Sequence, residues 1–213
     1  MKPKYEQVPL IKSLYNIKKE FFYNVHVPWH IHLEYELVFI RMDNGIKHVG
    51  SHFGGIGGME ILLLGPNLPH NWLVNKRSAP VGTDTDYQVV IHFPKSVFGA
   101  GFFELAPFAE INELLKKSEL GLCFKDGETA RIGKEMEAML HMKEFDRSMA
   151  LLELLQRLSA KEHTVLSSYG FNNVLNEEKG KRMNKVFKYI TINYKENICL
   201  LYTSPSPRDM RRS

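Results

Sequence analysis

Alternating polar and apolar residues near the N-terminus constrain the fold of this chain more than any other feature. In a β-strand, successive side chains point to opposite faces. The stretch Trp29–Leu37 would therefore have one apolar face and one polar face. The polar face would carry His30, His32, Glu34 and Glu36. A hydrophobic core needs no face so rich in imidazole and carboxylate groups, so the pattern indicates a pocket inside a small β-barrel.

A second motif lies further along the chain, where Gly65–Trp72 reads Gly-Pro-Asn-Leu-Pro-His-Asn-Trp. Its glycine and prolines predict a turn that leads into a strand, on which His70 and Trp72 share a face. Together the two motifs resemble the paired motifs of the cupin barrel. The residue sequences of the two motifs are most similar to those of the sensor domain of AraC-type transcriptional regulators. They read His-x-His-x-Glu-Tyr-Glu-Leu and Gly-Pro-Asn-Leu-Pro-His-x-Trp. The resemblance covers about residues 20–198.

The first half of the chain has the pattern of an all-β domain. Runs rich in branched and aromatic residues alternate with turn residues at short, regular spacing, which predicts a sandwich or barrel. Asp43–Gly45 is expected to form a hairpin turn, because Asn-Gly tolerates positive φ. The glycine-rich stretch Gly54–Gly58 is expected to form a flexible bend. The predicted strands are Leu33–Ile40, Ile46–Phe53, Glu60–Leu64, His70–Asn75 and Tyr87–Phe93.

The second half changes to a helical period, with apolar residues recurring at i, i+3, i+4 and i+7. The predicted helices are Pro107–Lys117, Glu128–Lys143, Arg147–Ala160 and Lys181–Tyr194. We therefore predict an α+β fold in which an N-terminal cupin-like antiparallel β-barrel is followed by α-helices. The leucines of Leu151–Leu158 cover more than one helix face. They are a candidate dimer seam on one side and a barrel contact on the other.

The resemblance to AraC-type regulators implies an order of domains. Residues 1–105 would form an effector-binding barrel, and residues 106–165 a helical segment that pairs two subunits. Residues 166–181 would form a linker. Residues 182–198 resemble the first helix of a helix-turn-helix DNA-binding domain. The helices that would enter the major groove are expected to be missing, so DNA would be bound only through that missing domain.

The last residues, 199–213, look foreign to the rest of the chain. Cys199–Asp209 are what a transposase adapter used for sequencing libraries would encode if it were translated. A segment of this origin carries no information about the fold. We expect this tail to be an artefact and the natural sequence to be visible up to about Ile198. A natural Pro/Ser-rich tail is the alternative.

Composition narrows the function classes. The formal charge is +4, but the tail supplies +2 of it through three arginines and one aspartate. The remaining small excess of positive charge indicates no specific partner. Outside the tail Cys123 is the only cysteine, so no internal disulfide can form, which fits a reducing compartment. The sequence shows neither a signal peptide nor an apolar run of ~18 residues. We expect a cytoplasmic protein with no membrane attachment.

Four residues match the positions that hold a metal in metallocupins, namely His30, His32, Glu36 and His70. Imidazole nitrogens and one carboxylate suit Fe, Mn, Zn or Ni. The second motif departs from the metallocupin pattern, because Leu68 replaces a glycine and Val74 an asparagine. Three interpretations stay open: a bound metal, a metal-free polar pocket, and histidines that are hydrogen-bonded for structure alone. The resemblance to sensor barrels favours the polar pocket and no cofactor.

The ligand-binding residues predicted from the two motifs are His30, His32, Glu36, His70 and Trp72. Tyr35 and Phe39 lie on the opposite strand face, so we assign them to the core. The predicted function is the ligand-sensing and dimerisation part of an AraC-type regulator, which is not an enzyme. It would form a homodimer and bind a small effector such as a sugar or sugar acid. The alternative is a metal-dependent cupin enzyme, either an oxygenase or an isomerase.

Overall fold

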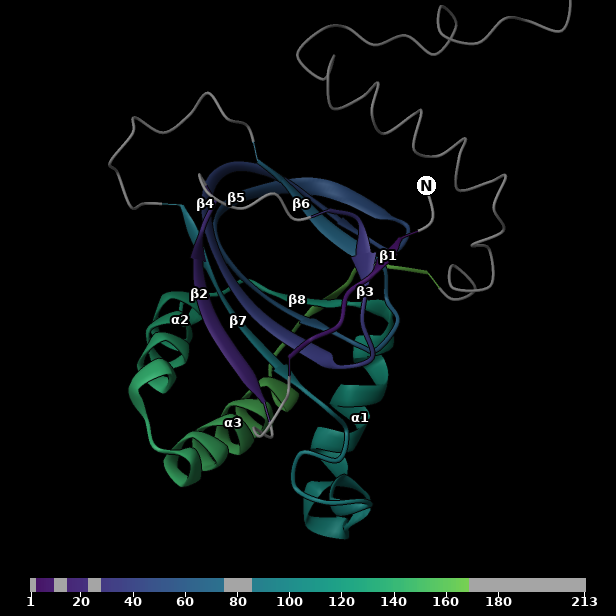
Figure 1. Cartoon of the computed structure of the whole chain (residues 1–213), viewed down its shortest axis with the longest axis vertical. Coiled ribbons are helices and arrows are strands. Elements are labelled where there is room, and N and C mark those ends of the chain that lie inside the picture. Colours follow the sequence, from purple (N-terminus) through teal and green to yellow (C-terminus); the bar gives the residue numbers. More distant parts are fainter. Residues whose placement is uncertain (1–2, 10–14, 23–27, 75–85, 169–213) are drawn as a thin grey trace, which may run out of the picture. The chain divides into compact units, whose positions relative to one another are not determined.

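The computed structural model describes residues 3–9, 15–22, 28–74 and 86–168. They form a curled, mainly antiparallel sheet followed by helices, which confirms the predicted α+β fold (Figure 1). The strands are β1 Lys4–Tyr5, β2 Asn16–Phe21, β3 His30–Ile31, β4 Tyr35–Val49, β5 His52–Leu64, β6 His70–Val74, β7 Tyr87–Phe93, β8 Leu122–Phe124 and β9 Thr164–Val165. The α-helices are α1 Ala109–Lys117, α2 Thr129–Ala138 and α3 Glu144–Ser159.

Strand β4 organises the barrel, because it is long enough to pair with three other strands. It pairs with β5 on one edge, and on the other edge first with β7 and then with β6. The exchange of partners coincides with a bulge in the β4–β5 register between Met42 and Gly45. Bulges bend strands and increase their twist, as the closure of a sheet requires. The predicted hairpin turn at Asp43–Gly45 is therefore wrong, because the strand continues through it.

The connection between β4 and β5 lies at Gly50–Ser51 instead. Gly50 has a φ of 55°, a conformation that glycine adopts at no steric cost. The predicted bend at Gly54–Gly58 is also wrong, since these glycines pair with β4 in the middle of β5. Backbone pairing with β4 keeps this stretch within the strand despite its weak strand propensity, and Gly58 takes a φ of 86° where the β4–β5 register shifts.

The two faces of the sheet have different roles. The outer face of β4, β5 and β7 packs against the three α-helices, which lie along one side of the barrel (Figure 1). Tyr35 and Phe39 belong to this helix-covered core, as predicted from their position in the strand. The inner face holds a second apolar cluster that includes Trp72. Polar side chains of β4, β6 and β7 complete the interior of the barrel, and these form the candidate site.

Helix α3 contributes its leucines to the core of its own chain. Leu151, Leu154, Leu155 and Leu158 are buried in the helix-covered core. Leu152 is half-buried and packs against the same core. The leucine stripe therefore does not form an outward-facing seam. The exposed apolar residues of this helix are Phe145 and Met149.

Two short strands interrupt the predicted helical segment. Strand β8 pairs with β5, and β9 pairs with β8. The chain then stays on the barrel up to residue 168. Leu166 packs against the inner cluster, and the Ser51 backbone N–H donates to Oγ of Ser167. The first residues of the predicted linker are thus attached to the barrel.

The rest of the predicted linker, the predicted helix over residues 182–198 and the tail 199–213 lie outside the described residues. Among the helices of the described ranges, none combines the length and apolar character needed to cross a bilayer.

Candidate functional site

The structure brings all five residues of the two motifs to one place inside the barrel. His30 on β3 pairs across the sheet with His70 on β6. Trp72 follows on the same face of β6, with its ring centroid 5.8 Å from that of His70. Glu36 is the second residue of β4, and His32 lies in the loop before it. All five side chains are buried.

The predicted continuous strand through these residues is broken. Strand β3 ends at Ile31 and β4 begins at Tyr35, so His32 lies in a loop rather than in a strand. The loop lets the chain leave its pairing with β6 and start a new pairing with β7 and β5. The simple alternation of faces therefore fails for Glu34, which is not part of the group of potential metal ligands.

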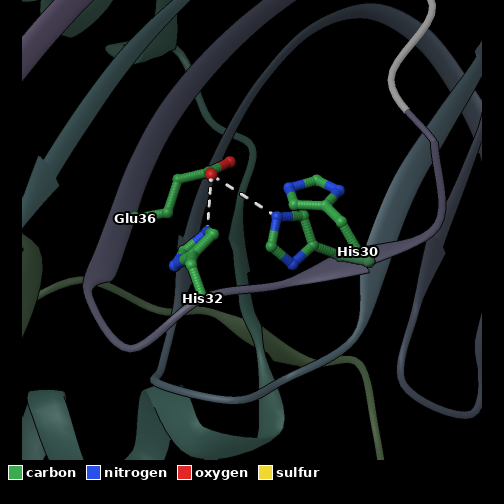
Figure 2. Close-up of side chains that lie close together, drawn as sticks. His30, His32 and Glu36 are labelled. Carbon is green, nitrogen blue, oxygen red and sulfur yellow. Dashed lines mark hydrogen bonds and ion pairs between the residues drawn. The ribbon is translucent and has the colours of Figure 1, made fainter. Parts of the chain in front are cut away.

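The carboxylate of Glu36 is the centre of the site. Its Oε2 atom lies 3.1 Å from Nε2 of His32, 2.9 Å from Nε2 of His92 and 3.4 Å from Nε2 of His70. Figure 2 shows His30, His32 and Glu36 pointing toward one another in the barrel interior. The ligand atoms of His30, His32, Glu36 and His70 all lie within 4.8 Å of one another.

Backbone carbonyl groups fix the orientation of three imidazole rings. Nδ1 of His30 lies 2.8 Å from the Pro28 carbonyl oxygen, and Nδ1 of His70 lies 2.8 Å from that of Leu68. Nδ1 of His32 lies 3.0 Å from the Glu34 carbonyl oxygen. A carbonyl oxygen only accepts hydrogen bonds, so each Nδ1 carries the proton and donates it. In the neutral rings Nε2 then presents a lone pair.

These three Nε2 atoms face carboxylates. Those of His32 and His70 face Glu36, and that of His30 lies 3.2 Å from Oε2 of Glu6. A lone pair facing a carboxylate is repulsive unless a proton or another cation lies between them. Nε2 of His70 has no hydrogen-bond partner among the described residues. The arrangement is thus complete only with added positive charge.

The protonation equilibria of the site differ from residue to residue. Burial alone would raise the pKa of Glu36, but His70 and the hydrogen bonds from His32 and His92 hold it well below its usual range. Burial and the neighbouring His70 lower the pKa of His30 to about 4. Burial is the largest single influence on His32 and opposes its charged form, but the hydrogen bond to Glu36, the charge of Glu36 and the contacts with Glu34 together outweigh burial and raise the pKa of this ring. The cluster therefore keeps Glu36 ionised.

A cavity of about 210 Å³ opens next to this cluster. Besides His30, Glu36 and Trp72, its lining includes Glu6, Lys18, Glu20, Pro28, Gln88, Val90 and His92. Sequence patterns single out none of these additional residues as a site member. They reach the cavity because β2 pairs with β7 and β7 pairs with β4, which sets His92 directly opposite Glu36. The signal available in the sequence was the alternation of Gln88, Val90 and His92 within one strand.

The donor set of the site fits a metal ion chemically. Three imidazoles and one carboxylate are the ligands that Zn, Fe, Mn and Ni accept in proteins. Metal-binding histidines usually donate their second ring N–H to a carbonyl or carboxylate, and all three rings have this arrangement here. His30, His32, Glu36 and His70 are the residues that would hold the ion.

Comparisons with known proteins find remote likenesses only. No family model matches the chain, and no curated protein matches it. ToxT from Vibrio cholerae superposes with a TM-score of 0.38 and 10% identity, over 87% of this chain and 67% of that one. HEPD from Streptomyces albus, with 2-hydroxyethylphosphonate and Fe(II) bound, superposes with a TM-score of 0.29 and 18% identity, over 74% of this chain and 36% of that one. The function proposed for the chain therefore rests on its own residues and geometry.

Proposed function

We propose that this chain is the ligand-sensing and dimerisation part of an AraC-type transcriptional regulator. The observation that carries the proposal is the convergence of two sequence motifs on a buried polar cluster beside a cavity inside the barrel. Ligand sites are concave and contain a few placed polar groups among apolar walls. Burying so many polar side chains is costly unless partners satisfy them, so a small ligand is the natural complement of this cluster.

The helices outside the barrel have the second role in this proposal. Phe145 and Met149 are exposed on α3, on the side opposite its buried leucines, and would contact a second copy of the chain. The segment that follows β9 would then connect the barrel to a DNA-binding part. The first helix of that part is expected over residues 182–198, which lie outside the described residues. In this proposal the described residues act as sensor and dimerisation unit rather than as an enzyme.

The sensing role is tested by ligand-induced thermal stabilisation of the full chain against a library of small metabolites. Glu36→Ala and His70→Ala should each abolish the stabilisation that a hit produces, because each removes a polar group from the site. Glu113→Gln, at a carboxylate on the exposed face of α1, should leave the stabilisation unchanged. Binding that survives both site variants would place the ligand elsewhere and overturn the proposal.

The tautomers of the three histidines favour a second candidate, a metal-dependent cupin enzyme. A metal ion held by His30, His32, Glu36 and His70 would supply Lewis-acid or redox chemistry. The chain's own part is to hold the ligand atoms of three histidines and Glu36 within 4.8 Å of one another and to keep Glu36 ionised in a buried setting. The neighbouring cavity would bind and orient the substrate.

Metal analysis and product analysis separate the two candidates. The enzyme candidate requires about one Fe, Mn, Zn or Ni ion per chain after purification without chelators, and loss of that ion in His32→Ala. It also requires that a ligand incubated with the metal-loaded protein in air is chemically changed, as followed by mass spectrometry. Recovery of the ligand unchanged, with or without bound metal, would support the sensor instead.

A further inference from the structure

We propose that the barrel cavity takes a small organic cation with N–H donors, such as a primary ammonium or a guanidinium compound. The inference rests on the proposed sensing function and names the ligand class of that site. It is drawn from the described residues that line the cavity: three carboxylates against one ammonium group, next to the indole of Trp72, with two wall residues that each carry a buried acceptor atom without a partner.

The first unpaired acceptor belongs to Gln88, whose side chain is 3% exposed. Its Nε2 donates to Oε2 of Glu20 at 2.8 Å. A carboxylate oxygen can only accept, so the amide nitrogen must face Glu20 and the amide oxygen must point away from it. That oxygen, Oε1, is buried and has no hydrogen-bond partner among the described residues. A ligand beside it would have to donate a hydrogen.

The second unpaired acceptor belongs to His92, which is 2% exposed. Its Nε2 lies 2.9 Å from Oε2 of Glu36 and therefore carries the ring proton. Nδ1 of the neutral ring is then a lone-pair acceptor. This atom is buried and also lacks a partner within the described part of the chain. Leaving such groups unsatisfied in a buried setting is unfavourable, and a donor-rich ligand would remove that cost.

Formal charge points the same way. Among the described residues that line the cavity, Glu6, Glu20 and Glu36 carry carboxylates, and Lys18 carries the one ammonium group. Lys18 is already paired, since its Nζ lies 3.2 Å from Oε1 of Glu20. A neutral polyol could satisfy the acceptors but would leave the excess of negative charge. A sugar acid would add to that excess.

The size and walls of the cavity favour an organic cation over a bare metal ion at this position. A volume of about 210 Å³ is several times the ~30 Å³ that one water molecule occupies in the liquid. Pro28, Trp72 and Val90 supply apolar wall surface, which can contact alkyl carbons. The indole of Trp72 also attracts cations through its ring quadrupole. A metal ion would instead belong among the histidines around Glu36.

The test uses three probes of the same length and different charge: n-pentylammonium, pentan-1-ol and pentanoate. Binding to the full chain is measured by isothermal titration calorimetry at pH 7 in buffer treated with a chelator. Glucose and glucuronate are titrated in parallel, and zinc chloride is titrated separately in chelator-free buffer. We expect n-pentylammonium to bind at least tenfold more tightly than pentan-1-ol, and pentanoate to give no heat of binding.

Two variants of the same ion pair should act in opposite directions. Glu20→Gln removes a carboxylate and should weaken n-pentylammonium binding by roughly 3- to 10-fold, and Lys18→Met removes the competing cation and should strengthen it by a similar factor. Glu113→Gln and Lys116→Met alter an exposed pair on α1 with the same chemistry and should change the affinity by less than twofold. A merely structural role for Lys18 and Glu20 would make both site variants weaken binding.

The outcomes separate this inference from the proposed sensing function. Preferential binding of the ammonium probe with opposite effects of the two variants supports the inference. Binding of glucose, glucuronate or pentanoate in preference to the ammonium probe would overturn it and leave a sensor of another ligand class. Heat from zinc chloride alone would overturn it in favour of the metal site. Absence of binding by every probe, together with no hit in the metabolite library, would overturn both.

Discussion

Neighbouring groups rather than residue type decide what each histidine of this chain does. His30 and His32 are two positions apart, yet the pKa of the first falls to about 4 and that of the second rises. Both rings are buried, and burial opposes the charged form in each. They differ because His70 lowers the pKa of His30 further, whereas His32 hydrogen-bonds directly to the Glu36 carboxylate, which raises its pKa. The sequence motif contains both histidines but does not indicate that their pKa values shift in opposite directions.

The buried ring of His48 gives the chain a predictable pH dependence. It lies on the outer face of the barrel, stacked on Trp29 with centroids 3.9 Å apart. Burial, only partly offset by a hydrogen bond with the Gly50 backbone and reinforced by His52, lowers its pKa to about 4. The unfolded chain binds the proton first as the pH falls below 6.5. Stability is therefore full above that pH and is lost progressively between 6.5 and 4.

We expect His48→Phe, which keeps an aromatic ring against Trp29, to reduce that loss. Between pH 7.5 and pH 5.0, this histidine alone costs the wild-type chain about 2 kcal/mol of unfolding free energy. The variant should lose about that much less over the same interval. Urea unfolding at the two pH values measures both changes, and each protein serves as its own reference at pH 7.5. Equal losses in the two proteins would contradict the assignment.

The residues of the site divide into those that the sequence could predict and those that it could not. The five residues predicted from the sequence came from two local motifs, and the resemblance to cupin barrels, rather than strand spacing, predicted that the two motifs meet: His30, His32, Glu36, His70 and Trp72. His92 opposes Glu36 only because of the β4–β7 register. Register between strands about 50 residues apart is set by how they pair in the folded sheet, and a strand-by-strand pattern does not specify it.

At the scale of elements, the seam between α2 and the barrel depends on one glycine. A side chain at Gly133 would place its Cβ 2.4 Å from the ring of Phe39 on β4. This close approach lets α2 pack flat on the sheet, and Gly133 is buried. Alanine usually stabilises a helix interior by about 1 kcal/mol relative to glycine. Here the clash outweighs that gain.

Gly133→Ala should therefore lower the free energy of unfolding by about 1–2 kcal/mol, as overpacking of a core does when helix propensity only partly compensates. For a domain of this size the midpoint of thermal unfolding should fall by roughly 2–8 °C. Gly57→Ala is the matched control, because a Cβ there meets nothing within 4 Å. Differential scanning calorimetry of both variants measures the two midpoints. Equal midpoints would show that α2 moves aside without cost.

The sequence predicted the type of most elements better than their ends. Helical periodicity located α1, α2 and α3, since their apolar stripes face one continuous core. It missed β8, three residues long, because so short a strand has no period of its own and exists only through pairing with β5. The glycine-rich and Asn-Gly stretches were misassigned for the same reason. Their local preference for turns is overridden by hydrogen bonds to partner strands.

At the scale of the whole molecule, the exposed face of α3 predicts self-association. Phe145 is 72% exposed and Met149 is 43% exposed. Being four residues apart, they lie on one face of the helix, with half-buried Leu152 next along it. Exposed aromatic and methionine side chains are enriched at protein interfaces. In a two-fold dimer this patch would pack against the same patch of the second chain, so a single type of surface is sufficient for pairing.

Replacing these residues should separate the subunits without unfolding them. Size-exclusion chromatography with light scattering should give the wild-type chain a mass of twice 24.6 kDa, as expected for a dimer. The double variant Phe145→Asp/Met149→Lys should give 24.6 kDa, the mass of one chain. Because both side chains are exposed within one chain, the double variant should keep the circular dichroism spectrum and ligand affinity of the wild type. Leu33→Lys, at an exposed apolar residue of the β3–β4 loop, should remain dimeric. A wild-type chain that stays monomeric at 100 µM, or a double variant that stays dimeric, would place subunit contacts elsewhere and leave α3 with no part in pairing.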